Sequence, residues 1–597
     1  MRMRIAALVL SILLAHPSLA EEVATIHVVP GSHLDIGFTD TPDGVKAKRI
    51  RVLDDAIAAA QADPEFRWFE ESAWTIDAWR EAHKDDPKSL DAFKALLKEG
   101  RISASASWCS PHAAMFADHL DLLFFHLDRF ERDYGVRPVA AVLNDVPMFP
   151  QALVDACAAA GVKFLLVGAN TAFSPPLPRE IERTPFWWES PSGKRVLVWV
   201  DDDAYPAAYM KWGFDPDTAR FFAPKEFDPK VGALETMEKG ISRMVRSLAS
   251  PRGAAIVQHA FDNWDTGPAK KLPGFAKQWN DSKKGPRISL GGPEAFFRDI
   301  EERCGKDLPV KRGEWGGAWD AIRACNPVWT WRLRAAMKKM PADAPYATRA
   351  LLATAIEHSQ GLGPGWGGML TEAQTLAHND QVAGLFRRAV TAVDPKLADA
   401  VPPPIEMPKC EGEPEAWKAV LTRPRARFRA GKQWLGPFVV DSAPEIRTEL
   451  VYCTDQTVYT IRSSFDRAAL GVGDGAAVIE IPLRAAAKDV TLAPADSPDA
   501  CEGKWLRGEA PSFVVAPIGL RVNGLAHALK VTSDLVFSWC VVKDKDDAKS
   551  CWLQGLVARQ SRQCEFKDKT EKVLDFEKLY VGEPQKLEIH VRVEIVE

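Results

Sequence analysis

Two candidate metal ligands, His33 and Asp35, follow a short apolar strand near the start of the sequence. Residues i and i+2 of a strand point to the same face, so this imidazole and carboxylate can reach one ion while Leu34 packs on the other side. The β-branched run 25–29 supplies the strand, and the pair sits at its carboxyl end, where α/β folds usually build their sites. The alternative is a strand-end histidine bonded to a nearby carboxylate without a metal.

A second apolar strand, 141–143, ends in Asn144 and Asp145 just before a proline. Its position matches that of the first pair, because each carboxylate follows the carboxyl end of a predicted strand. Asp145 is therefore a candidate for the same site, at the carboxyl ends of the strands. An aspartate before a helix is also an ordinary N-cap, and this interpretation stays open.

The loop 259–268 follows strand 254–257 and is rich in carboxylates. Asp262 or Asp265 could protonate a leaving group if burial or a neighbouring carboxylate raises its pKa. Trp264 lies between them and is a candidate sugar platform. The alternative is a solvated loop in which the acids cap turns.

A further nitrogen ligand is expected from His358, which ends a predicted helix before a glycine-rich turn. His378 and His259 compete with it for this role. Sequence spacing does not rank the three, and a helix-terminal histidine often just compensates the helix dipole.

The elements that must position these residues alternate between strands and helices up to about residue 300. This order predicts an α/β fold with a parallel sheet or barrel and covering helices. The predicted strands are 26–29, 139–143, 164–167, 196–200 and 254–257, and the predicted helices are 45–62, 87–98, 120–134 and 150–160.

The rest of the chain changes character twice, so the sequence predicts three domains at 21–305, 306–400 and 401–597. Helical spacing at 329–340, 346–357 and 370–393 predicts a small helical bundle in the second. Short alternating stretches after the proline-rich joint 401–404 predict a β-sandwich in the third.

Residues 1–20 have the pattern of a signal peptide, with a basic start, an apolar stretch and a small-residue cleavage site. We therefore expect a periplasmic or secreted protein. No apolar stretch is long enough to span a bilayer, so membrane insertion is not expected. The net charge is −5 and no basic patch stands out, which argues against nucleic acid as a partner. Homo-oligomerisation is left open.

The chain has ten cysteines, and no pair shows the C-x-x-C spacing of a zinc ribbon or redox motif. In an oxidising compartment this number favours disulfides. The alternative is buried thiols that act as small apolar residues.

In this order, the segments resemble the glycoside hydrolase family 38 α-mannosidases and their bacterial relatives. That family carries His-x-His-x-Asp-x-Gly-Trp after a strand, and residues 32–38 match it from the second histidine onward. The resemblance implies a seven-stranded (β/α) barrel-like catalytic domain and one divalent metal ion, with zinc favoured by two nitrogens and two carboxylates. The implied ligands are His33, Asp35, Asp145 and His358.

The resemblance also implies a carbohydrate substrate and a retaining mechanism. Asp145 would be the nucleophile and Asp262 the acid/base, with carboxyl groups about 5 to 5.5 Å apart. Phe38 and Trp264 are the expected substrate-binding residues. Phe38 replaces the family's platform tryptophan, and Gly31 replaces its first histidine.

Two other functions remain alternatives. One is a metal-dependent polysaccharide deacetylase, which requires a His-x-x-x-His ligand pair that this sequence lacks, since His112 and His119 are seven residues apart. The other is a non-catalytic carbohydrate-binding protein on the same fold, which the departures at Gly31, Phe38 and Ser359 make credible.

Overall fold

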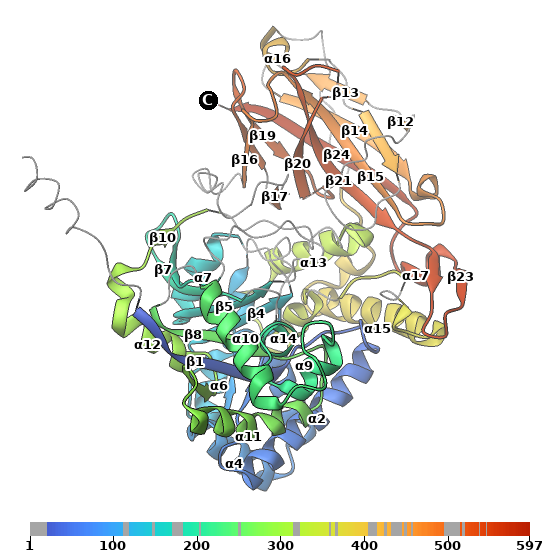
Figure 1. The fold of residues 1–597 in the computed structure, drawn as a ribbon. Helices are drawn as coiled ribbons and strands as arrows, with labels where there is room; N and C mark the ends of the chain where they lie inside the picture. Colours follow the sequence, from blue (N-terminus) through green and yellow to red (C-terminus); the bar gives the residue numbers. More distant parts are fainter. Residues whose placement is uncertain are drawn as a thin grey trace, which may run out of the picture.

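The architecture comes from a computed structural model in which the C-terminal sheets lie at one end of the molecule and the first domain at the other (Figure 1). The structure describes residues 21–110, 119–145, 150–169, 183–201, 205–248, 252–313, 323–357, 360–364, 368–403, 415–422, 427–431, 445–446, 451–454, 458–494, 514–515, 520–536, 538–544 and 546–596. The predicted signal peptide lies outside these residues. Among the helices in the described ranges, none has the length and apolar character needed to cross a membrane.

The first domain contains two five-stranded sheets that are mostly parallel. One has the order β3-β2-β1-β8, with β9 also paired to β1, and the other has the order β10-β6-β7-β5-β4, in which β6 is antiparallel to β7. Their strands are β1 (Glu21–Ser32), β2 (Trp68–Glu70), β3 (Ile102–Ala104), β8 (Arg252–His259), β9 (Arg287–Leu290), β4 (Ala140–Asp145), β5 (Phe164–Ala169), β6 (Phe186–Glu189), β7 (Arg195–Val200) and β10 (Val310–Lys311).

The seven-stranded barrel-like arrangement that the resemblance implies is not confirmed, because the described strands do not join into one continuous ladder. The two sheets meet through local bonds instead. Ala106 N donates to Ala140 O at 2.8 Å beside β4, and Gln258 N of β8 donates to Asp201 Oδ2 after β7, also at 2.8 Å. The α/β class and the predicted strand positions are confirmed.

Helices cover the sheets, and local capping sets where several of them begin. Thr41 accepts from Gly44 N before α2, and Asp86 accepts from Ser89 N before α4, each with a proline at the start of the helix. The helices are α2 (Pro42–Ala62), α3 (Ala73–Ala82), α4 (Pro87–Lys98), α6 (Leu127–Tyr134), α7 (Ala152–Ala160), α8 (Ala207–Met210), α9 (Pro216–Phe222), α10 (Ala233–Ser247), α11 (Gly267–Ser282) and α12 (Glu294–Cys304). The predicted helix 120–134 is divided, with a 3₁₀ turn at Leu120–Leu123 before α6.

The predicted bundle is present as helices α13 (Pro327–Lys339), α14 (Tyr346–Ala355) and α15 (Glu372–Thr391). A capping box between Thr371 and Gln374 starts α15. Leu333, Ala353 and Phe386 share one core with residues of α7 and β5. The bundle therefore packs directly on the first domain.

Two six-stranded antiparallel sheets form the C-terminal region, as the sequence predicts. Side chains from both sheets meet in one apolar core, which is the arrangement of a β-sandwich. The first sheet contains β12 (Glu445–Ile446), β11 (Arg427–Gly431), β15 (Gly475–Leu483), β21 (Cys551–Gln560), β20 (Ser538–Lys543) and β17 (Val514–Val515), and the second contains β13 (Val451–Thr454), β14 (Val458–Asp466), β24 (Lys586–Val596), β19 (Ala528–Thr532), β18 (Leu520–Asn523) and β16 (Thr491–Pro494).

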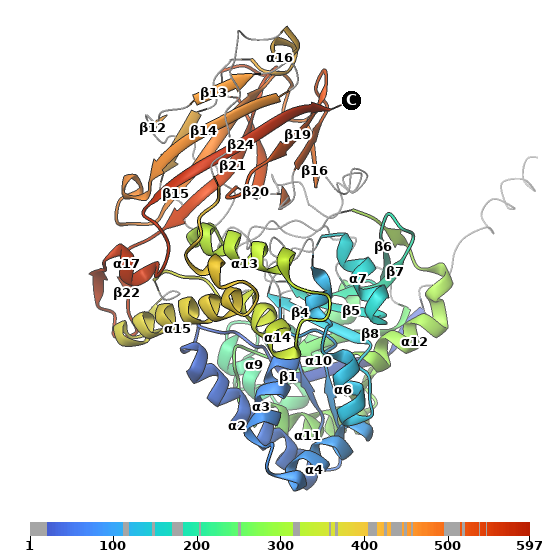
Figure 2. The same ribbon diagram turned by 180° about the vertical axis from the view of Figure 1, so that it is seen from behind.

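Helix α13 connects the bundle to the sandwich (Figure 2). Its first backbone N–H groups donate to a carboxylate of the C-terminal region, Glu583, at 3.2 Å from Val328 and 2.7 Å from Trp329. Arg467 lies 3.6 Å from the same carboxylate and over the ring of Tyr580 at 4.7 Å. Buried polar contacts thus join the last domain to the bundle.

The disulfide prediction is wrong for the seven cysteines whose side chains the structure describes, since none of the seven is in a disulfide. They are Cys109, Cys157, Cys304, Cys325, Cys540, Cys551 and Cys564. Six are buried, and burial raises the pKa of Cys325 to about 11, so these thiols act as small apolar residues. The remaining three cysteine side chains lie outside the described part of the chain.

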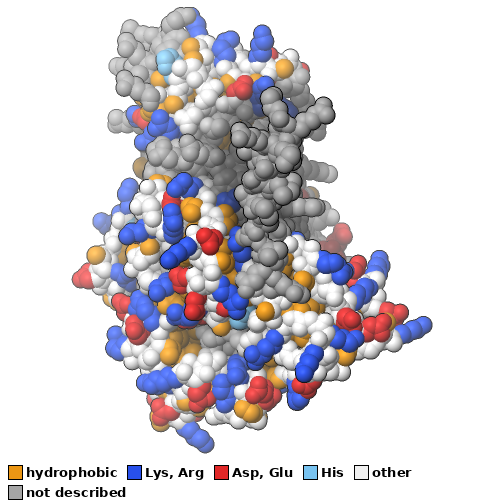
Figure 3. All heavy atoms as spheres, turned by 60° about the vertical axis from the view of Figure 1, so that its left-hand side comes forward, with side chains coloured by type: hydrophobic (Ala, Val, Ile, Leu, Met, Phe, Trp, Pro, Cys, Tyr) orange, Lys and Arg blue, Asp and Glu red, His pale blue; other side chains and the backbone are white. Residues whose placement is uncertain are grey.

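Charged side chains of both signs are interspersed over the face shown in Figure 3. This distribution agrees with the small net charge of −5. It is unlike the continuous basic surface of nucleic-acid-binding proteins.

Candidate active site

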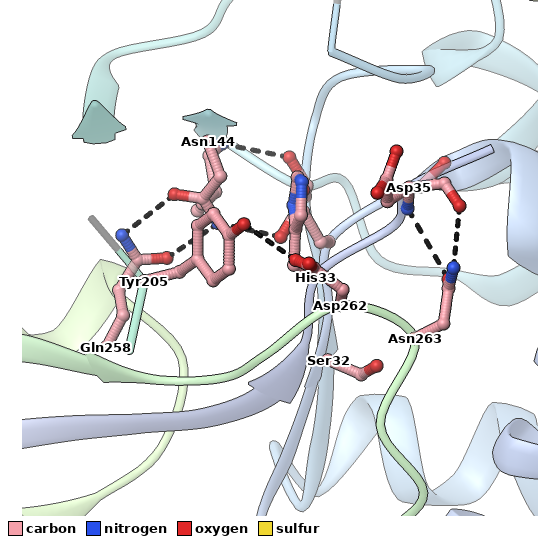
Figure 4. Close-up of polar contacts among 12 residues, drawn as sticks. Ser32, His33, Asp35, Asn144, Tyr205, Gln258, Asp262 and Asn263 are labelled. Carbon is pink, nitrogen blue, oxygen red and sulfur yellow. Dashed lines mark hydrogen bonds and ion pairs between the residues drawn. The ribbon is translucent and has the colours of Figure 1, made fainter. Parts of the chain in front are cut away.

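The carboxyl ends of β1 and β8 bring His33 and Asp262 side by side (Figure 4). The parallel pairing of the two strands resumes beyond their ends as an isolated bridge between these residues. His33 N donates to Phe261 O at 3.0 Å, and Asn263 N donates to His33 O at 2.8 Å. Backbone bonds therefore fix the relative position of two residues that are far apart in the sequence.

The His33 side chain is buried between a carboxylate and an aromatic ring. Its Nδ1 lies 2.8 Å from Glu71 Oε1, and its ring stacks on Tyr205 with centroids 4.1 Å apart. Burial lowers the pKa of His33, but the negative charges of Glu71, Asp145 and Asp262 outweigh it and raise the pKa to about 9. The imidazole is thus protonated at neutral pH when no cation is bound.

Glu71 belongs to a buried relay that crosses from one sheet to the other. Its Oε2 accepts from Asn144 Nδ2 at 2.7 Å, and the Asn144 amide exchanges two hydrogen bonds with Gln258, at 2.9 and 3.0 Å. The backbone N–H of Gln258 then donates to Asp201 Oδ2 at 2.8 Å. Side chains next to β2, β4, β8 and β7 are thereby held in one arrangement.

Asp145 ends β4 in a strained backbone conformation. Its φ of 69° lies in the left-handed region, which few residues other than glycine adopt, and the residue is only 7% exposed. Strain of this kind costs of the order of 1–3 kcal/mol and clusters at functional sites. An N-cap residue usually has extended backbone, so Asp145 does not have the conformation of an ordinary N-cap.

Tyr205 connects the acids of the rim. Its hydroxyl donates to Asp262 Oδ1 at 2.6 Å. Burial and then the negative charges of Asp145, Asp262 and Asp35 raise its pKa well above the usual value, which keeps the phenol protonated. All three predicted carboxylates thus lie close enough to act electrostatically on one hydroxyl.

Asp35 is positioned through its backbone by Asn263. The Asn263 amide donates to Asp35 O at 2.6 Å and to Thr39 Oγ1 at 2.9 Å, and its Oδ1 accepts from Asp35 N at 3.4 Å. Asn263 itself has a φ of 48° and is fully buried. The β8 loop and the β1 loop are therefore tied together beside the rim.

The two histidines that compete with His358 have other contacts in the structure. His259 Nε2 lies 3.3 Å from Asp215 Oδ2, and the pair is buried. His378 Nε2 lies 3.0 Å from Gly361 O, and a Cβ added at Gly37 would be 2.2 Å from its Cε1. His378 thus packs against the loop that carries Asp35. His358 lies outside the described residues.

The two predicted substrate-binding residues are both half-buried. Phe38 lies in the turn after β1. Trp264 stacks on Tyr209 with ring centroids 4.9 Å apart and joins an aromatic cluster that includes Phe261. Packing accounts for at least one face of this indole.

The predicted metal site is incomplete in the described part of the chain. Among those residues no three His, Cys, Asp or Glu side chains form a group that could hold a metal ion. One contact does resemble a metal centre, because ligating histidines usually donate their second ring nitrogen to a carboxylate, as His33 does to Glu71. The ligand set of His33, Asp35, Asp145 and His358 stays a prediction.

Several residues of the rim were not identified from the sequence. Glu71 stands at the carboxyl end of a strand, as Asp145 does, so its position in the sequence could have identified it as a site residue. Tyr205 and Asn263 carry no such signal, since their roles depend on loops that meet far from their own strands.

Comparison with known proteins places this geometry in a family. Residues 23–314 match the model of the glycosyl hydrolases family 38 N-terminal domain. The chain is a divergent member of this family and a glycoside hydrolase. A comparison with curated protein sequences finds no significant match.

Two solved structures from Enterococcus faecalis share the fold at very low sequence identity. One is an α-mannosidase of strain V583, with a TM-score of 0.58 and 9% identity over 96% of this chain and 87% of that chain. The other is a protein in glycosyl hydrolase family 38, with a TM-score of 0.52 and 8% identity over 96% of this chain and 86% of that chain. At such identities the likeness concerns the fold.

Proposed function

We propose that this glycoside hydrolase is an exported, metal-dependent retaining enzyme that releases terminal sugars in the manner of an α-mannosidase. The observation that supports this most is the placement of Asp145 and Asp262. They lie at the carboxyl ends of β4 and β8, and the charges of both act on His33 and Tyr205. The family and the α-mannosidase fold relative support the choice of sugar.

In the proposed mechanism, Asp145 attacks the anomeric carbon while Asp262 protonates the departing glycosidic oxygen. Asp262 then takes a proton from a water molecule, which displaces Asp145 and releases the sugar with retained configuration. The Tyr205 hydroxyl, bound to Asp262 Oδ1, orients this carboxyl group. Asp145 itself sits at the end of β4 in a left-handed backbone conformation.

We further propose that His33, Asp35, Asp145 and His358 hold one divalent cation, with zinc favoured by the mixed nitrogen and oxygen donors. Such a cation supplies binding of adjacent sugar hydroxyls. The hydrogen bond of His33 to Glu71 supports a ligand role, because it would hold the ring with Nε2 directed away from Glu71. Phe38 and Trp264 are the proposed sugar contacts.

The experiment is hydrolysis of an aryl α-mannoside by the full-length protein with added zinc. We expect turnover in the wild type and loss of at least 1,000-fold in Asp145→Ala without loss of folding, an order of magnitude typical for a missing nucleophile. NMR of the first sugar released should show the α-anomer. Prior treatment with a chelator should abolish activity, and zinc should restore it.

Asp265→Asn is the matched control, because Asp265 lies in the same loop and accepts a turn-forming bond from Gly267 N at 2.9 Å. We expect its turnover to stay within a few fold of the wild type. Measurable sugar binding without hydrolysis of any α-glycoside would instead favour the non-catalytic alternative.

A further inference from the structure

A groove of about 520 Å³ lies between helices α2 and α3 on one side and α14 and α15 on the other. Its volume is in the range of small-molecule sites, which is about 300–1,000 Å³. The residues that line it include none of His33, Asp35, Asp145, Tyr205 or Asp262. Among the described residues, the groove lining thus shares no side chain with the catalytic rim.

Three aromatic side chains lie in the groove lining. Trp74 and Tyr346 are half-buried, and the buried Trp108 lies against Tyr346 with ring centroids 6.2 Å apart. Tyr346 is held in place from two directions. Its hydroxyl donates to Asp77 at 3.1 Å, and the Arg129 guanidinium lies 4.0 Å from its ring centroid. These rings are fixed before any ligand binds, which lowers the entropic cost of binding.

Gln360 adds a buried acceptor to this lining. The residue is 1% exposed, and its Oε1 has no hydrogen-bond partner in the described structure. Its backbone is fixed, because Arg323 Nη1 donates to Gln360 O at 3.0 Å. A buried acceptor without a partner destabilises the protein, and a hydrogen-bond donor on a ligand would remove that penalty.

Fixed aromatic rings, an unsatisfied amide oxygen and several charged side chains suit a ligand with apolar faces and many hydroxyl groups. We propose that the groove binds sugar residues of an oligosaccharide, as a second site apart from the catalytic rim. The choice of ligand rests on the proposed function, since the glycan that the enzyme cleaves is the oligosaccharide at hand. Substrates of several residues would thus gain affinity that a single sugar lacks.

A blocking variant tests this site. Ala347 lines the groove and is exposed on α14, so Ala347→Trp should fill the space without removing a contact. Ala58 is exposed on α2 outside the lining, and Ala58→Trp is the matched control. Binding of linear α-mannotriose is measured by calorimetry on the Asp145→Ala background. We expect Ala347→Trp to raise the dissociation constant of one of the two sites, the groove, by at least tenfold. Ala58→Trp should change it less than twofold.

Tyr346 supplies an independent pair of variants. Tyr346→Ala should weaken mannotriose binding about as much as the blocking variant, whereas Tyr346→Phe, which keeps the ring, should bind within threefold of the parent protein. Thermal unfolding midpoints verify that each variant is folded.

The outcomes separate this inference from the proposed function. Aryl α-mannoside hydrolysis measures the catalytic rim, and Ala347→Trp should leave it within twofold of the wild type. If no aryl glycoside is cleaved but mannotriose binding is still weakened by Ala347→Trp, the second sugar-binding site is supported and the catalytic assignment is wrong. Absence of mannotriose binding, or binding that is insensitive to Ala347→Trp and Tyr346→Ala, overturns the second site.

Discussion

Replacing Glu71 by glutamine tests the reasoning about the rim, because it changes one oxygen of a buried side chain to a nitrogen and keeps its shape. Both carboxylate oxygens of Glu71 accept hydrogen bonds in the structure, from His33 Nδ1 at 2.8 Å and from Asn144 Nδ2 at 2.7 Å. A glutamine has one acceptor oxygen and one donor amide. It can therefore keep the bond to one partner while its NH₂ group faces the donor of the other.

The magnitude follows from these two contacts. The bond between charged Glu71 and protonated His33 is of the kind that contributes about 1.5–3 kcal/mol, and the loss of the carboxylate charge also removes what keeps the buried His33 protonated. We expect Glu71→Gln to lower the free energy of unfolding at pH 7 by about 2–3 kcal/mol. Glu71→Ala should cost more, because it leaves both donors without their acceptor.

Urea unfolding of the metal-free protein measures this difference, provided that the m-value of the variant equals that of the wild type. NMR of protein labelled with ¹⁵N-histidine gives a second readout. The His33 signal should change from the protonated form to a neutral form in Glu71→Gln. If His33 is a ligand, zinc affinity should also fall by about 10- to 100-fold.

Asp54→Asn is the control, because the partly exposed Asp54 accepts from the Trp79 indole at 2.7 Å and is not part of the relay. We expect little change in the His33 signal there. An unfolding free energy within 0.5 kcal/mol of the wild type in Glu71→Gln, with His33 still protonated, would refute the relay as described.

Three further predictions concern other parts of the molecule. Gly37→Ala should lower the free energy of unfolding by about 2–5 kcal/mol in urea, because Gly37 has a φ of 94° and its new Cβ would meet the His378 ring; a cost below 1 kcal/mol would contradict this packing. Burial raises the pKa of Glu583 from its usual 4.5 to about 7 despite the charge of Arg467, so the folded state binds more protons between these pH values and stability should fall by up to about 3 kcal/mol as pH rises through them. Glu583→Gln should flatten that part of a stability-versus-pH curve, and an unchanged slope would count against it. Thiol titration of the unreduced, denatured protein should find at least seven reactive groups, because seven cysteines form no disulfide.

The sequence predicted much of the fold because strands and helices of this chain have clear local signals. The buried run at β5 and the capped start of α4 are examples, since apolar pattern and turn residues determine both. Whether the strands form one barrel or two sheets could not be predicted, because this depends on which sheet edges pair and not on any one strand. The prediction of disulfides was wrong for a similar reason, because the number of cysteines and the expected compartment do not say which thiols lie close together.

The candidate site was predicted in part. His33, Asp145 and Asp262 each follow a strand, so strand-end position located them. Glu70 ends β2 and Glu71 follows it, and sequence alone does not say that Glu70 lies 2.5 Å from Arg49 while Glu71 lies 2.8 Å from His33. Which partner each glutamate contacts depends on loops that are far apart in the sequence.

The position of β24 in the C-terminal sheet has a consequence for folding order. This strand, Lys586–Val596, pairs with β14 on one side and β19 on the other, so it fills the middle of its sheet. Until it has been synthesised, β14 and β19 each present an open edge, and the sandwich core lacks Ile589 and Val591. Glu583 precedes β24 by a few residues, so the contact that holds α13 also forms late. A ribosome-bound chain would therefore complete its catalytic sheets well before the bundle gains its final support.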